Sequence, residues 1–250
     1  MNRQTPNSKS QGPCGKRIKN PKRIIENAKW ASCQGFSLLA FGFCFLHSPA
    51  WGEEKLAPLP VQLPKPLFEG TPKALKGLNL AKPRGNEPFM APEGVKNVAL
   101  NKPVKSSDPE PTVGELKQVT DGDKEAVEGS YIELGPGLQW VQIDLQAVYS
   151  IYAIMMWHFH KEARVYRAVV VQVADDPDFI TNVRTIFNND ASNSAGLGVG
   201  SDLEYLDEYT GKLIDAKGVK GRFVRCYSKG NTSNDQNHYT EVEVWGLPAK

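Results

Sequence analysis

QWVQIDL, residues 139–145, is the stretch that decides the fold class. Val141, Ile143 and Leu145 alternate with Gln142 and Asp144, and a period of two residues is typical of a strand with one buried face. Four later stretches have the same β-branched and aromatic character: SIYAIMMW (150–157), AVVVQVA (168–174), GRFVRCYS (221–228) and TEVEVWG (240–246). Short strands separated by Gly, Asn and Asp predict an all-β sandwich or barrel.

The first 52 residues have the pattern of a secretory signal peptide with a long basic n-region. Eight Lys and Arg residues precede or flank the apolar run FSLLAFGFCFL, residues 36–46, and the small residues Ala50 and Gly52 follow it. A run of this length is too short to span a bilayer core of about 30 Å. We therefore expect cleavage after Gly52 and export to the periplasm, the cell surface or the medium. The alternative is an uncleaved membrane anchor.

Residues 53–95 are dense in proline and show no sustained period. Proline fixes φ and removes a backbone donor, so the segment is expected to be an extended, mostly unpaired linker. Together with the signal peptide it would form a disordered N-terminal region. Some of its apolar side chains are expected to dock onto the domain that follows, namely Leu59, Val61, Leu63, Leu67 and Phe68.

Charge and cysteine content exclude some functions. Residues 53–250 hold 22 basic and 27 acidic residues, because 8 of the 30 basic and 1 of the 28 acidic residues precede them. A net charge of −5 argues against nucleic acid, whose binding depends on Lys and Arg. Cys226 is the one cysteine beyond residue 52, so an exported protein would have no internal disulfide.

Five stretches in order resemble one family. NVALNKPVKSS, VTDGDK, QWVQIDLQAVYSI, RFVRCYS and TEVEVWG are similar to the motifs of the discoidin, or coagulation factor 5/8 type C, domain. This family belongs to the galactose-binding-like β-sandwiches, and the resemblance covers residues 96–247. It implies a jelly roll of two antiparallel sheets with the ligand loops at one end. It also implies a non-catalytic binding module, with a glycan or glycoprotein as partner.

The resemblance further implies a structural calcium ion. Its ligands would come from the loop at VTDGDK, a later hydroxyl and the start of the last strand: Gln118, Asp121, Asp123, Ser130, Thr240 and Glu241. Calcium takes six to eight oxygens and mixes carboxylates with carbonyls, so this set suits it. The alternative is that TDGD is only a polar turn.

The sugar-binding relatives place polar and arginine side chains after the strand that ends here at Trp157. The corresponding candidates are His158, His160 and Arg164. Two polar loops add Asn188, followed by Asn189 and Asp190, and the group Asn231, Asn237 and His238. Arg and His side chains can donate to sugar hydroxyls. Asn is equally an ordinary turn residue, and Trp157 either stacks on a sugar or packs in the core.

Two other functions stay open at this stage. A cell-envelope interaction or adhesion domain would use the same loops to bind another envelope protein; their polar character makes a membrane partner unlikely. A zinc-dependent hydrolase would need three protein ligands, and His158, His160 and His238 are the histidines available for it beyond residue 52.

Overall fold

The computed structural model describes residues 55–66, 75, 77–85 and 87–249. The predicted signal peptide and part of the predicted linker, including Leu67 and Phe68, lie outside these residues. Trp51–Lys250 forms one compact unit. None of the helical structure among the described residues is long and apolar enough to cross a membrane.

The described residues form eleven strands and one short 3-10 helix, so the all-β prediction is confirmed. The elements are β1 (Leu56–Pro58), β2 (Met90–Pro92), β3 (Lys96–Asn97), β4 (Val104–Ser106), η1 (Leu116–Thr120), β5 (Ile132–Leu134), β6 (Gln139–Trp157), β7 (Val170–Ala174), β8 (Arg184–Asn188), β9 (Lys212–Ser228), β10 (Asn237–Tyr239) and β11 (Glu241–Pro248). All pairs between these strands are antiparallel.

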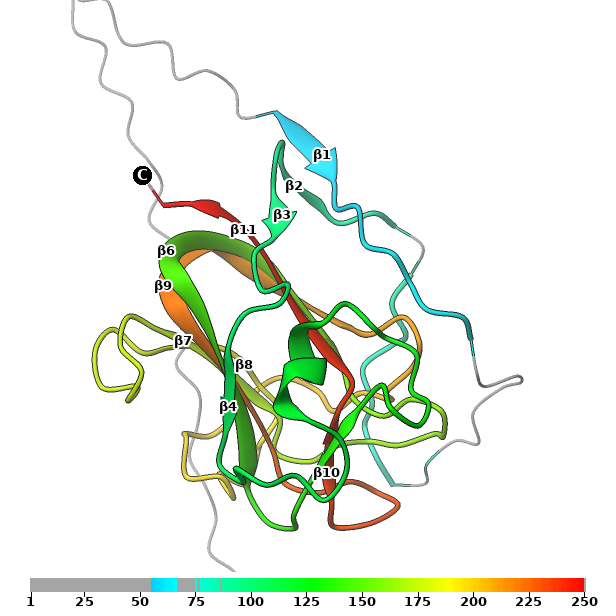
Figure 1. Ribbon diagram of the computed structural model, residues 1–250. Helices are drawn as coiled ribbons and strands as arrows, with labels where there is room; N and C mark the ends of the chain where they lie inside the picture. The colour runs from blue at the N-terminus through cyan, green and yellow to red at the C-terminus, as the bar shows by residue number, and fades with distance from the viewer. Residues whose placement is uncertain (1–54, 67–74, 76, 86, 250) are drawn as a thin grey trace, which may run out of the picture. The chain divides into compact units, whose positions relative to one another are not determined.

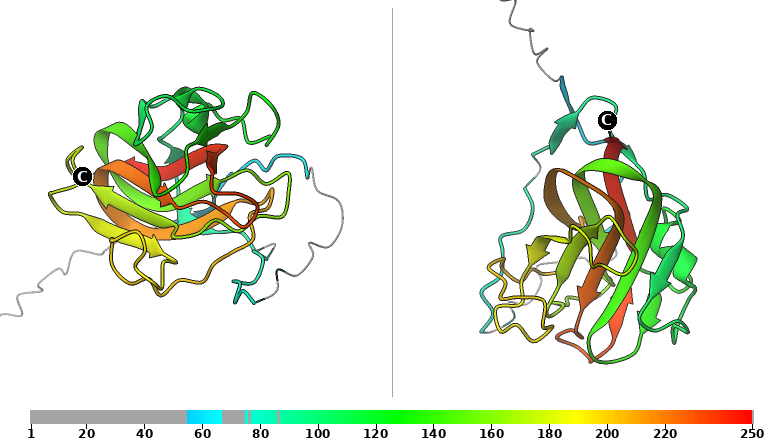
Figure 2. Two further views of the ribbon diagram at one scale, coloured as in Figure 1. Left: turned by 90° about the horizontal axis from the view of Figure 1, so that it is seen from below. Right: turned by 90° about the vertical axis from the view of Figure 1, so that its left-hand side faces the viewer.

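Two long, bent strands join the layers of the sandwich. β6 and β9 pair along their length, with register shifts between Asp144 and Tyr149 and between Ile151 and Ala153. Both strands curl over at these shifts (Figure 1). On β9 the second shift lies at Lys217 and Gly218, which both have positive φ. The early part of β6 therefore lies with β4, β7 and β8, and its later part lies with β11 and β3. The described strands form one seven-stranded antiparallel sheet, which folds over into two layers, and two two-stranded sheets. The predicted antiparallel sandwich is therefore observed (Figure 2).

The main core lies between the two layers. Val141, Ile143 and Leu145 are fully buried, as the alternation predicted, and pack with β-branched residues of β7, β9 and β11. Cys226 is also buried here, and burial raises the pKa of its thiol to about 12. It behaves as a small core side chain rather than as a reactive thiol.

The proline-rich segment is extended but is more than a spacer. β1 pairs with β2, and the Leu59 N–H donates to the Phe89 carbonyl oxygen at 2.9 Å. A second apolar cluster, which we call the outer cluster, joins these strands to the sheet. It contains Ala91, Val95, Ala153, Met155, Trp157 and Trp245, with Leu59, Val61, Phe89, Tyr152, Leu213 and Leu247 packed against it. Docking is confirmed for Leu59 and Val61, whereas Leu63 is 47% exposed.

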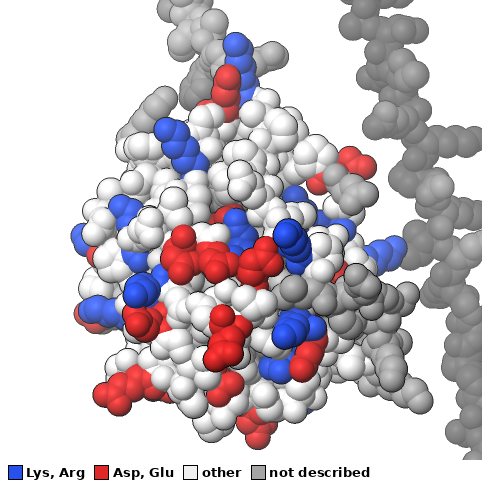
Figure 3. All heavy atoms as spheres, turned by 45° about the vertical axis from the view of Figure 1, so that its right-hand side comes forward, with Lys and Arg blue, Asp and Glu red and all other residues white. Residues whose placement is uncertain are grey.

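The surface shown in Figure 3 mixes charges of both signs. Basic side chains are interspersed with acidic ones, and several acidic side chains lie side by side across the middle of this face. The described residues visible on this face form no large basic patch.

Candidate functional site

Three loops meet at one end of the sandwich and carry most of the predicted ligand residues. The Arg167 N–H donates to the Gly230 carbonyl, and the Lys229 N–H donates to the Arg167 carbonyl. The Lys229 ammonium group donates to the Ser194 carbonyl at 3.0 Å. These contacts join the loop after β6, the long loop after β8 and the loop between β9 and β10. The expected grouping of loops is therefore present, and hydrogen bonds join the three loops.

A buried polar network occupies the interior next to these loops. His158 Nδ1 lies 3.1 Å from Asp207 Oδ1, and the His158 ring stacks on Tyr166 at 4.1 Å between centroids. Tyr166 in turn contacts His238 Nδ1 at 2.9 Å. His158, Tyr166 and His238 are all at most 3% exposed. In this arrangement His158 and His238 bond to protein groups.

His238 is held as a neutral imidazole. Burial lowers its pKa to about 3, and the charges of Arg164 and His158 act in the same direction. Burial raises the pKa of Tyr166, so its hydroxyl keeps its proton and can donate to Nδ1. His238 Nε2 can then donate to the Glu133 carboxylate at 3.0 Å. One neutral tautomer of His238 therefore satisfies both the Tyr166 and the Glu133 contact. The Glu133 contact alone would raise the pKa of the ring and favour its charged form. Burial has the larger effect on the pKa, because only 3% of His238 is exposed.

Because the folded protein keeps His238 neutral, we expect the free energy of unfolding to depend on pH. The folded pKa of about 3 lies below the ordinary value of 6.5, so between these values the unfolded chain binds more protons. The contribution of His238 to the free energy of unfolding is therefore fully present above pH 6.5 and is lost as the pH falls towards 3. The free energy changes by up to about 1.4 kcal/mol per pH unit. Thermal unfolding of wild type and His238→Gln across this range isolates the contribution. The difference between them should shrink as the pH falls; a constant difference would contradict the assignment.

Arg164 and His160 have separate surroundings. Arg164 is 8% exposed; its NH2 group donates to Glu162 Oε2 at 2.9 Å, and its guanidinium lies 4.5 Å from the Phe159 ring centroid. His160 Nε2 lies 2.9 Å from the Lys124 carbonyl oxygen, so it faces the predicted calcium loop. Among the described residues, no three His, Cys, Asp or Glu side chains are arranged to hold a metal ion. The zinc-hydrolase alternative therefore gains no support.

The predicted asparagines shape the loops. Asn237 Oδ1 accepts from the Ser228 hydroxyl and from the Gly230 N–H. Asn231 Oδ1 accepts from the N–H groups of Ser233 and Asn234. Asn188 donates to the Gly198 carbonyl, and its side-chain oxygen accepts from the Asp190 N–H. All three side chains organise turns, and their role in ligand binding stays a prediction.

A cavity lined by polar and apolar side chains opens between the loop after β6 and the loop after β8, and we call it the loop cleft. It has a volume of about 440 Å³. The lining residues are Asn79, Arg167, Ala168, Asn189, Asp190, Ala191, Ser192, Ser194, Asp202, Leu203 and Glu204. Asn189 and Asp190 were indicated by the sequence, whereas Arg167, Asp202 and Asn79 were missed. No local pattern could have found them, because they come from three separate segments.

Two side chains of the loop cleft have donor groups without a partner among the described residues: Arg167, whose side chain is exposed, and Asn189, whose Nδ2 is buried. Arg167 is exposed, and its guanidinium forms no ion pair with a described residue. Asn189 is 6% exposed; its Oδ1 accepts from the Val169 N–H at 2.7 Å, which fixes the amide, while its Nδ2 has no partner among the described residues. Asp190 is ionised, because N–H groups of the loop lower the pKa of its carboxyl group although burial opposes this. The cleft thus combines donors with a carboxylate acceptor.

Trp157 packs in the core. It is fully buried in the outer cluster, and its Nε1 donates to the Tyr209 carbonyl at 2.9 Å. Gly211 has φ of +66°, and a Cβ there would lie 2.5 Å from the Trp157 ring. The core alternative is therefore correct for Trp157, and stacking on a sugar is not available to it.

Glu241, one of the predicted calcium ligands, lies beside the loop at Asp121 and Gly122. Its carboxyl group is fully buried; its Oε2 accepts from the Gly122 N–H at 3.2 Å, and its Oε1 has no partner among the described residues. Burial raises its pKa to about 9, and the nearby Glu243 and Asp121 carboxylates add to the effect. A buried carboxyl oxygen without a partner is unfavourable unless it is protonated or binds a cation.

Of the other predicted calcium ligands, all except Thr240 form hydrogen bonds within residues 118–130, in η1 and the loop that follows it. Asp123 Oδ2 accepts from the Ser130 hydroxyl at 2.8 Å, and Asp121 Oδ1 accepts from the Asp123 N–H. The Gln118 side chain donates to the Gly129 carbonyl. The Thr240 hydroxyl donates to the His158 carbonyl. Glu241 fits a calcium ion best if backbone carbonyls supply several other ligands, as calcium readily accepts.

Comparison with known proteins gives similarities to solved structures alone. No protein-family model matches the sequence, and no curated protein gives a match. Among solved structures, the fold is similar to a family 89 glycoside hydrolase from Clostridium perfringens, with 18% identity and a TM-score of 0.45. That match covers 61% of this chain but 15% of the hydrolase chain.

Two binding modules match over almost their whole length. A fucose binding module from Streptococcus pneumoniae has 19% identity and a TM-score of 0.43; the match covers 61% of this chain and 98% of the module. A chitosan-binding module from Paenibacillus sp. IK-5 has 19% identity and a TM-score of 0.40, with coverages of 60% and 99%. At this level of similarity, these proteins carry no information on the ligand of this chain.

Proposed function

We propose that this protein is an exported, non-catalytic binding module for carbohydrate, and that the loop cleft is its binding site. One observation carries the proposal. A cavity of about 440 Å³, within the range of small-molecule sites, is lined by a fixed amide, an ionised carboxylate and a guanidinium that has no ion-pair partner among the described residues. Sugars present adjacent hydroxyl groups that both donate and accept, so this mixture of side chains suits them.

The chemistry of the cleft follows from its geometry. The guanidinium of Arg167 offers a planar fork of donors to two neighbouring hydroxyls. The buried Nδ2 of Asn189 has no partner among the described residues, so it would gain a hydrogen bond if a ligand hydroxyl came within reach. Both groups sit on loops whose backbones are tied together, so little ordering is needed on binding.

The calcium ion belongs to the proposal as a structural element. It would bind Glu241 at the start of β11 and the loop at Asp121 and Asp123. The support is the unpartnered, buried Oε1 of Glu241. An ion there would tie the loop to the last strand and would stabilise the folded state without taking part in ligand binding.

Export rests on the pattern of the first 52 residues, and the place of action is the periplasm, the cell surface or the medium. The partner is then a glycan or glycoprotein outside the cytoplasm. A single site of this size binds weakly, and several copies on one surface would add avidity.

Arg167→Ala and Asn189→Ala test the site. Loss of a hydrogen bond to a charged group costs about 1.5–3 kcal/mol, so we expect Arg167→Ala to weaken glycan binding roughly 10-fold or more. The matched control is Arg222→Ala, which removes the same charge at the Asp144 ion pair outside the cleft. Isothermal titration of one glycan into wild type, Arg167→Ala, Asn189→Ala and Arg222→Ala measures the four affinities. Equal affinities for Arg167→Ala and wild type would overturn the site.

A further inference from the structure

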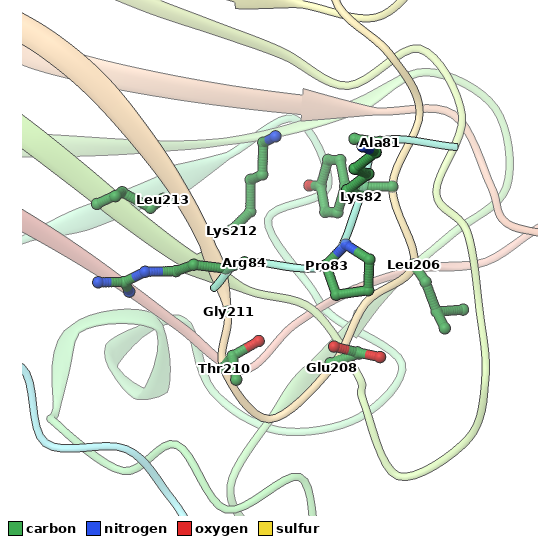
Figure 4. A pocket seen from close by; sticks show the side chains of 11 residues that line it. Ala81, Lys82, Pro83, Arg84, Leu206, Glu208, Thr210, Gly211, Lys212 and Leu213 are labelled. Carbon is green, nitrogen blue, oxygen red and sulfur yellow. The ribbon is translucent and has the colours of Figure 1, made fainter. Parts of the chain in front are cut away.

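A second cavity lies beside the loop cleft, and we call it the basic cavity. Its volume is about 210 Å³. It is lined by Ala81, Lys82, Pro83, Arg84, Tyr205, Leu206, Glu208, Thr210, Gly211, Lys212 and Leu213 (Figure 4). This volume is below the range of drug-sized sites, so it accommodates one substituent or one ring rather than an oligosaccharide.

The segment before β2 forms one wall of the basic cavity. Leu80 bridges to Glu204 in parallel fashion, and the Ala81 N–H donates to the Glu204 carbonyl at 2.7 Å. The opposite wall is fixed by the Trp157–Tyr209 hydrogen bond, because Gly211 lies directly against the Trp157 ring. Both walls are therefore defined before any ligand binds.

The cavity carries more positive than negative charge. Lys82, Arg84 and Lys212 line it against Glu208, a balance of 3 − 1 = +2, in a body with net charge −5 from 22 basic and 27 acidic residues. The Lys212 ammonium lies 4.7 Å from the Phe187 ring centroid and 4.8 Å from that of Tyr205. Arg84 donates to the sulfur of Met155 and extends away from Glu208 (Figure 4).

Arg84 and Lys212 are both half-buried, and neither forms an ion pair with a described residue. Burial lowers the pKa of both Arg84 and Lys212. Asp202 and Asp207 act on Lys212 from beyond ion-pair distance, and Asp207 is already bonded to His158. Partly buried cations without a carboxylate partner are unfavourable, and an anionic group in the cavity would relieve this.

The basic cavity and the loop cleft share one structural unit. The cleft is lined by Asn79 and residues 202–204, and the basic cavity by residues 81–84 and 205–206. The two cavities thus flank the Leu80–Glu204 bridge on its two sides. A chain molecule seated in the cleft can reach the basic cavity along residues 79–84.

We propose that the basic cavity binds the oxyanion of an acidic saccharide, a carboxylate or a sulfate ester, whose neighbouring ring occupies the loop cleft. This inference rests on the proposed carbohydrate binding and names its ligand class. Among the lining residues, Lys212 and Lys82 would supply the cationic contacts to the anion, and Thr210 would supply a hydroxyl donor. The neighbouring cleft supplies the contacts to neutral hydroxyls, so the pair of cavities selects saccharides that carry charge on one residue.

Matched saccharide pairs test this inference with the full chain. One pair is a galacturonate tetrasaccharide and its carboxyl-reduced form; the other is a sulfated galactan tetrasaccharide and its desulfated form. Titrations use wild type, Lys212→Met, Lys212→Arg and the control Lys105→Met, which removes a cation from a different cavity. Sulfate and glucuronate are titrated separately, with the NMR signals of Gly211 and Lys212 as readout.

We expect wild type to bind one acidic saccharide about 10-fold more tightly than its neutral partner. The preference should disappear in Lys212→Met, persist in Lys212→Arg and Lys105→Met, and weaken with salt. The pair that shows it identifies carboxylate or sulfate. Equal binding of acidic and neutral members, lost in Arg167→Ala, would overturn the inference and leave the proposed function standing. If no saccharide binds, the proposed function fails. Chemical-shift changes of Gly211 and Lys212 on addition of sulfate or glucuronate, seen in wild type but not in Lys212→Met, would still support an anion site. If wild type shows no such changes either, the anion site is overturned.

Discussion

Removal of residues 55–95 from the compact unit Trp51–Lys250 is expected to lower the free energy of unfolding by roughly 4–8 kcal/mol. The deletion strips Leu59, Val61 and Phe89 from the outer cluster and leaves Trp157 and Trp245 facing water. Burial of one large apolar side chain contributes about 1.5–3 kcal/mol, and several are lost at once. Chemical denaturation of the two chains measures the difference.

Single substitutions separate packing from chain length in this prediction. Leu59→Ala should lower stability by about 2 kcal/mol, whereas Leu56→Ala should change it little because Leu56 is 58% exposed. If residues 96–250 alone unfold with the same midpoint as the longer chain, the outer cluster does not stabilise the domain and the segment is only a linker.

Calcium is expected to raise the melting temperature of the wild-type protein by about 5–10 °C when it is present at about 100 times its Kd. Glu241→Gln should abolish this rise. Without calcium the same variant should be at least as stable as wild type, because glutamine replaces a buried carboxyl group whose pKa is raised to about 9. The control is Glu128→Gln, which changes an exposed carboxylate in the loop between η1 and β5, the loop that contains Asp121 and Asp123.

The calcium response should also depend on pH. In the absence of calcium, the folded state binds more protons than the unfolded state between pH 4.5 and 9, since the pKa of Glu241 is raised, so its contribution falls as pH rises. Calcium must displace that proton, and its stabilisation should therefore be larger at pH 8 than at pH 6. If calcium leaves the melting temperature unchanged at both pH values, the loop at Asp121 and Asp123 is an ordinary polar turn.

The sequence predicted those parts of the fold that depend on local periodicity. Alternation at Val141, Ile143 and Leu145 identified a buried face, and the structure buries all three. The short strands expected at residues 139–145 and 150–157 are instead one strand, β6, because the chain bends at Gln146 (φ +65°) without leaving the sheet. A bend and a break look alike in the hydrophobic pattern.

The candidate site was predicted only in part, for a physical reason. The chemistry of the imidazole ring makes His158 and His238 ligand candidates. It does not show that Asp207, Tyr166 and Glu133 contact these rings in the interior. Arg167 looked no different from any surface arginine. Its place in the cleft depends on contacts between loops distant in sequence, which no local pattern encodes.

The most direct test of carbohydrate binding is a glycan array probed with the compact unit in calcium, with wild type and Arg167→Ala on the same slides. We predict that wild type binds a small group of related glycans and that the substitution removes or strongly weakens this binding. No wild-type signal above background, or the same glycans bound equally by both proteins, would contradict the loop cleft as a carbohydrate site.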